Sequence, residues 1–108
     1  MITLALLFIS LLNIVVYPTF STEPANVIIT ISLTRSPNNR RLEWSCDAPT
    51  GMYRASLIEL DGANSPARYR VEWNSVSAGE YVCQVRLIGV DEKLMDMSTA
   101  KFVVGSRY

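Results

Sequence analysis

The 108-residue sequence contains no histidine, and its ten basic side chains are balanced by ten acidic ones. Without histidine the chain lacks the commonest metal ligand and a frequent catalytic base, so a serine would have no imidazole to activate it. A net charge of zero removes the electrostatic attraction that usually draws a protein to nucleic acid. We therefore expect no enzyme activity, no metal site, no small-molecule cofactor and no nucleic-acid partner.

Charge is also missing from the N-terminus, where no charged side chain precedes Glu23. Residues 2–17 form an almost continuous apolar run, and Pro18 ends it. Thr19 and Ser21 then place small residues at the minus-three and minus-one positions of a cut after Ser21. This arrangement is typical of a secretory signal peptide that is removed from the mature protein.

We therefore expect a signal peptide at residues 1–21 and a secreted, extracellular domain at residues 22–108. Two alternatives remain open. An uncleaved run would act as a membrane anchor, although it is shorter than the roughly 20 residues that a spanning helix needs. A buried core helix is disfavoured, because nothing later in the sequence looks built to cover it. Only retention of residues 1–21 would give the protein a membrane partner.

The two cysteines of the chain, Cys46 and Cys83, both lie in the expected mature domain. Cysteines that pass through an oxidising compartment tend to pair, so we expect a structural disulfide between them. A redox role is disfavoured because the sequence has no Cys-x-x-Cys spacing. Two cysteines without histidine are also too few ligands for a zinc site.

Several segments after residue 22 alternate between apolar and polar side chains, and none shows a sustained helical period. This pattern is typical of half-buried strands, and polar turns separate them at short intervals. We therefore expect an all-β fold, an antiparallel sandwich of six to seven strands. The side chains expected in its core are Leu42, Trp44, Val71, Trp73, Tyr81 and Val85.

Residues 77–83, Ser-Ala-Gly-Glu-Tyr-Val-Cys, resemble the Asp-x-Gly-x-Tyr-x-Cys run of immunoglobulin domains, with Ser77 in place of the aspartate. The resemblance implies an immunoglobulin-like sandwich in which Tyr81 forms the tyrosine corner, its hydroxyl bonded to nearby backbone. It also implies that Cys46 and Cys83 are the cysteines of strands B and F, so that the disulfide joins the two sheets.

A second resemblance competes with the first. Residues 42–49, Leu-Glu-Trp-Ser-Cys-Asp-Ala-Pro, are similar to strand B of fibronectin type III domains, which carries a core tryptophan followed by a proline. The sequence also departs from antibody-like domains, because no tryptophan follows Cys46 in the next expected strand. Both families share the sandwich architecture, and the sequence leaves the choice open with a preference for the immunoglobulin-like form.

A rigid sandwich without catalytic groups favours a protein-binding module that serves recognition, adhesion or an immune-type ligand or decoy role. In the resembled fold the loops after strands B and F emerge at one end. Apolar side chains there are typical of protein contacts, and the candidates for an extracellular or cell-surface partner are Met52, Tyr53, Val90, Leu94, Met95 and Met97. Alternatively, the domain assembles with itself or with a receptor subunit through an exposed strand edge.

Overall fold

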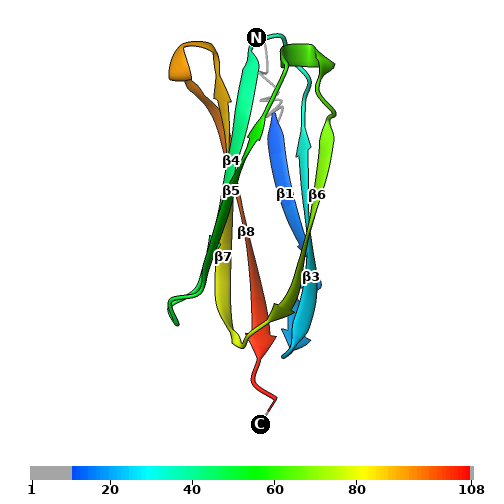
Figure 1. Cartoon of the computed structure of the whole chain (residues 1–108), viewed down its shortest axis with the longest axis vertical. Helices are drawn as coiled ribbons and strands as arrows, with labels where there is room; N and C mark the ends of the chain where they lie inside the picture. The colour runs from blue at the N-terminus through cyan, green and yellow to red at the C-terminus, as the bar shows by residue number, and fades with distance from the viewer. Residues whose placement is uncertain (1–10, 108) are drawn as a thin grey trace, which may run out of the picture.

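The computed structural model describes residues 11–107, which form two β-sheets without an α-helix between those positions (Figure 1). The three-stranded sheet has the order β1–β3–β6, with bounds Leu12–Tyr17, Ala25–Leu33 and Arg68–Val76. The five-stranded sheet has the order β2–β8–β7–β4–β5, with bounds Phe20–Thr22, Leu94–Gly105, Gly79–Gly89, Asn39–Asp47 and Tyr53–Glu59. Short 3-10 turns follow β5 and β7, at Gly62–Asn64 (η1) and Val90–Glu92 (η2). The predicted all-β sandwich is therefore confirmed, with more strands than the sequence pattern indicated.

The core lies between the sheets, where the alternating side chains of the strands meet. Of the side chains expected there, Leu42, Trp44, Tyr81 and Val85 are buried, whereas Val71 and Trp73 are half-buried and pack against the core.

An aromatic cluster occupies one end of this core. The rings of Tyr81 and Phe102 stack with centroids 4.7 Å apart, and Trp73 meets Tyr81 edge-on at 5.4 Å. Such ring pairs stabilise a core beyond the area they bury.

Tyr81 forms the tyrosine corner that the resemblance implied. Its hydroxyl donates a 2.8 Å hydrogen bond to the backbone carbonyl of Ser77, in the turn before β7. Burial, with a smaller contribution from the charge of Glu23, raises the pKa of this hydroxyl. The group therefore stays protonated and keeps its donor role.

The topology corresponds to an immunoglobulin-like sandwich, with β1, β3 and β6 in the positions of strands A, B and E. In the other sheet β8, β7, β4 and β5 take the positions of G, F, C and C′. Cys46 therefore lies on strand C rather than strand B. Trp44, on the same strand, takes the place that the sequence reading left without a tryptophan.

The disulfide between Cys46 and Cys83 is present, but the expectation that it joins the two sheets is wrong. The two cysteines are direct cross-strand partners on β4 and β7, with Cα atoms 4.0 Å apart. The physical reason is the early start of the fold: β1 adds one strand before Cys46. The bond therefore clamps the centre of the five-stranded sheet and does not connect it to the other sheet.

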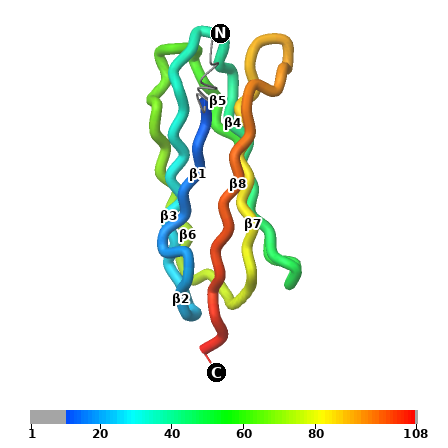
Figure 2. The backbone as a smooth tube through the Cα atoms, turned by 180° about the vertical axis from the view of Figure 1, so that it is seen from behind, coloured from blue at the N-terminus to red at the C-terminus, as the bar shows by residue number. Residues whose placement is uncertain are grey.

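That early strand lies within the predicted signal peptide. Leu12, Ile14 and Val16 are buried, and β1 pairs antiparallel with β3 over its whole length. Figure 2 shows β1 running beside β8, the strand of the other sheet that it contacts. The sandwich thus includes strands upstream of the predicted domain start at residue 22. Removal of residues 1–21 stays a prediction, and residues 1–10 lie outside the described part of the chain.

The alternative of a membrane anchor would require a helix long enough to span the bilayer. Between residues 11 and 107 no helix is long and apolar enough to cross a bilayer. The apolar residues of β1 instead alternate: the inward ones are buried, and Val15 and Tyr17 are exposed. Alternation of this kind was hidden in the sequence because both faces of β1 carry apolar residues.

The carboxylate of Glu23 ties the start of β3 to two other parts of the chain. It accepts backbone N–H bonds from Ala78 at 2.9 Å and from Arg107 at 3.3 Å. These donors lower the pKa of Glu23 below its usual 4.5, because they stabilise the ionised form. The β6–β7 turn and the segment after β8 are therefore held by one charged group.

Candidate functional site: the outer face of the five-stranded sheet

The outer face is the side of the five-stranded sheet that turns away from the core, formed by every second residue of β5, β4, β7 and β8. The strand register aligns these residues in rows across the sheet. One row contains Tyr53, Asp47 and Val82, and another contains Leu57, Glu43, Arg86 and Met97. The strongly exposed apolar members are Tyr53 (67%), Leu57 (48%), Met97 (48%) and Val82 (40%). Apolar groups gathered on one face are typical of a contact surface.

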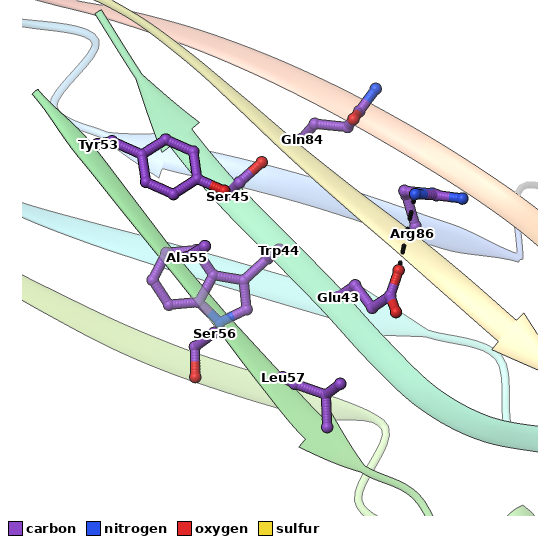
Figure 3. A pocket seen from close by; sticks show the side chains of 9 residues that line it. All are labelled: Glu43, Trp44, Ser45, Tyr53, Ala55, Ser56, Leu57, Gln84 and Arg86. Atoms are coloured by element: carbon purple, nitrogen blue, oxygen red, sulfur yellow. Dashed lines mark ion pairs between the residues drawn. The ribbon is translucent and has the colours of Figure 1, made fainter. Parts of the chain in front are cut away.

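A hollow of about 420 Å³ lies on the β5 side of this face (Figure 3). Its floor is the row between the two above, where Ala55 faces Ser45 and Ser45 faces Gln84. These side chains are smaller than Tyr53 and Leu57, which rise on either side of Ala55 along β5. The hollow therefore follows from the smaller size of the floor residues.

An ion-pair chain crosses the same face beside the hollow. Arg41 donates to the Glu43 carboxylate at 2.9 Å and to Glu92 at 2.8 Å, and Arg86 approaches Glu43 at 3.7 Å. Arg41 lowers the pKa of Glu92, mainly through their hydrogen bonds. The charges thus neutralise one another locally, and Glu43 and Arg86 lie between Leu57 and Met97 in their row. The face therefore mixes exposed apolar side chains with paired charges, and non-obligate protein interfaces have a similar mixed composition.

The structure divides the six partner-binding candidates rather than gathering them at one end. Because β4 and β7 are antiparallel neighbours, the turns after them lie at opposite ends of the sheet. Met52 and Tyr53 belong to the β4–β5 end, whereas Val90, Leu94 and Met95 belong to the β7–β8 end. The idea of a shared loop cluster was wrong because it assumed that these strands occupy different sheets.

Three of the candidates form a second, smaller hollow at the β7–β8 end. Val90, Leu94 and Met95 line it together with Leu11, and its volume is about 320 Å³. Met95 is half-buried against the core and fills the space above Gly89. Met97 instead lies on the outer face, opposite Arg86. Tyr53 and Met97 are therefore the candidates that the outer face brings onto one surface.

Sequence reasoning missed Leu57 and Val82 of this surface. Val82 lies in an alternating strand, so its outward direction was readable, whereas the alternation of residues 52–60 is imperfect and left the face of Leu57 unsettled. What the sequence did not reveal was the strand order, which decides that β5, β7 and β8 share a sheet.

Between residues 11 and 107 no group of three or more histidine, cysteine, aspartate or glutamate side chains is placed to hold a metal ion. The absence of an enzyme activity stays a prediction.

No protein-family model matches the sequence, and no curated protein matches it. Solved structures do resemble the fold. A PKD domain of an M14-like peptidase from a Thermoplasmatales archaeon is 11% identical, with a TM-score of 0.61 over 89% of this chain and 94% of that one. A CARDB domain from Pyrococcus furiosus, in complex with di-metal ions, is 11% identical, with a TM-score of 0.53 over 89% and 92%.

A family 76 glycoside hydrolase from Bacteroides thetaiotaomicron also matches, at 13% identity and a TM-score of 0.56. The match covers 85% of this chain but only 20% of the hydrolase. At these identities the likeness concerns the fold alone. The chain has the immunoglobulin-like β-sandwich architecture that PKD and CARDB domains share.

Proposed function

We propose that this chain is an extracellular protein-binding module that holds its partner on the outer face of the five-stranded sheet. The observation that carries the proposal is the concentration of Tyr53, Leu57, Val82 and Met97 on one exposed face. Exposing each of these apolar side chains to water is unfavourable, and burying it against a partner surface would remove that unfavourable free energy. The rigid sandwich beneath them limits the entropy lost on binding.

Two features support an extracellular location. The Cys46–Cys83 disulfide is typical of proteins that fold in an oxidising compartment. The apolar N-terminal run is typical of secretory targeting. A cut after Ser21 would remove β1 and most of β2, so secretion with the whole sandwich requires that residues from Leu12 onward be kept.

The test compares two variants that each add one positive charge. Met97→Lys places the charge on the outer face, at the β8 end of the row that contains Arg86, and Asn74→Lys places it on the exposed side of β6 in the other sheet. Labelled protein is titrated onto intact cells of the producing organism. The proposal is supported if Met97→Lys loses saturable binding and Asn74→Lys keeps it. Equal binding by both variants would show that the outer face is not the binding surface.

A further inference from the structure

The described part of the sandwich has four edge strands, and three of them are protected. The edge of β1 is capped by side chains of β8: the Leu11 N–H donates to Asp96 Oδ2 at 3.0 Å and the Ile14 N–H to Ser98 Oγ at 3.2 Å. The strand β2 has only three residues. On β6 every outward side chain from Arg68 to Asn74 is charged or polar. Charged, short or covered edges resist pairing with another strand.

The fourth edge, on β5, is less protected than the other three: its charged residues are Arg54, whose guanidinium lies over the Trp44 and Trp73 rings, and Glu59 at the end of the strand. It contains no proline, and it pairs with β4 over all seven residues without a register shift. Its outward side chains at Tyr53, Ala55 and Leu57 are uncharged and exposed. A regular strand whose outward face is uncharged from Tyr53 to Leu57 is a template for strand addition.

The register shows which backbone groups of β5 are free to pair. Beyond the two ends of β5, the Ala48 N–H bonds to the Met52 carbonyl and the Leu60 N–H to the Arg40 carbonyl, both at 2.9 Å. In an antiparallel ladder bonded pairs occur at every second residue, so the even-numbered residues of β5 bond to β4. The N–H and C=O groups of Tyr53, Ala55, Leu57 and Glu59 therefore point to the open edge.

We propose that this edge pairs antiparallel with β5 of a second copy of the chain, around a two-fold axis at Ser56. Ala55 then faces Leu57 of the second copy, and Tyr53 faces its Glu59. The four outward residues exchange about eight backbone hydrogen bonds. The two five-stranded sheets become one continuous sheet, and this pairing is separate from binding a foreign partner on the outer face.

The occupant is a second copy because the edge is complementary to itself in this register. The Tyr53 hydroxyl donates to the carboxylate of the opposing Glu59, and Leu57 covers the small Ala55. Arg54 faces Ile58, so no like charges lie opposite each other. Such an edge buries less area than a standard interface, so we expect a reversible dimer with a dissociation constant of micromolar order.

The first test is a charge swap, read by sedimentation equilibrium on the full chain. The double variant Ala55→Lys/Leu57→Lys places lysine opposite lysine, and Ala55→Glu/Leu57→Glu places glutamate opposite glutamate. Each should weaken the dimer at least tenfold, and a one-to-one mixture should restore it. Met97→Lys, away from the edge, should leave the dimer unchanged. Melting temperatures establish that all variants are folded.

The second test fixes the register. Ser56 lies opposite itself in a non-bonded pair, where Cα atoms approach to about 4.5 Å, within reach of a disulfide. Ser56→Cys should therefore form an oxidised dimer, whereas Leu57→Cys, displaced from its own copy, should not. A wild-type chain that stays monomeric at millimolar concentration overturns the proposal. So does a dimer that both charge variants leave unchanged, or equal cross-linking by the two cysteine variants.

Discussion

Replacing Ile14 by alanine tests whether β1 is a structural part of the mature protein. Ile14 is only 4% exposed and faces Ile31 across the three-stranded sheet. Truncating a buried isoleucine to alanine costs about 2–5 kcal/mol, and an edge strand that can relax favours the lower part of this range. We therefore expect a loss of about 2–3 kcal/mol in the free energy of unfolding. For a domain of this size that loss lowers the melting temperature by roughly 10–20 °C.

The matched control is Val15→Ala, one residue further along the same strand. Val15 is 51% exposed, and its truncation should change the free energy of unfolding by less than about 0.5 kcal/mol. Thermal and urea denaturation of the purified protein, followed by circular dichroism, measures both variants. If Ile14→Ala has the same melting temperature as the wild type, β1 does not belong to the folded domain. An intact mass that begins at residue 22 would identify the cause as removal of the N-terminal segment.

Three further changes have expected outcomes. Replacing Cys46 and Cys83 together by alanine should lower the free energy of unfolding by about 2–4 kcal/mol in urea titrations; an unchanged midpoint would show that the bond adds nothing. Tyr81→Phe removes the hydrogen bond to the Ser77 carbonyl and should cost about 1 kcal/mol by the same assay, with a loss below 0.3 kcal/mol counting against the corner. The lowered pKa of Glu23 means that its bonds stabilise the fold above the unfolded value of 4.5 and are lost as the pH falls through the folded value. Glu23→Gln should therefore be less stable than wild type at neutral pH and equal to it in acid, and a constant difference at all pH values would contradict this sign.

Alternation made much of the fold predictable from the sequence. From Leu42 to Cys46 in β4 and from Tyr81 to Leu87 in β7 every second residue is buried, and only Val82 among the residues between them is apolar, so Leu42, Trp44, Tyr81 and Val85 were assigned correctly to the core. The tyrosine corner followed from residues 77–83, because its geometry is local and requires only a turn before β7.

The N-terminus was not predictable in the same way. The apolar run at residues 2–17 has the composition of a signal peptide, and composition does not distinguish a leader from a strand with two apolar faces. Placing the first strand too late shifted every later strand by one. As a consequence Cys46 was assigned to the wrong strand, and its bond with Cys83 to the space between the sheets.

The candidate surface depended on long-range pairing that a single sequence does not encode visibly. Tyr53 and Met97 were recognised as exposed apolar residues, but they were attributed to loops at one end of the fold. They share a surface because β4 and β7 lie between β5 and β8 in one sheet. Leu57 and Val82 join them for the same reason.

Site-specific photo-crosslinking tests the central claim, partner binding on the outer face, most directly. A benzophenone side chain is introduced at Gln84, in the middle row of the outer face, or at Arg70, on the exposed side of β6. Each protein is bound to intact cells, irradiated and analysed for covalent adducts. The account predicts a discrete protein adduct from position 84 and none from position 70. An adduct from position 70 alone, or from neither position while the protein remains bound, would contradict it.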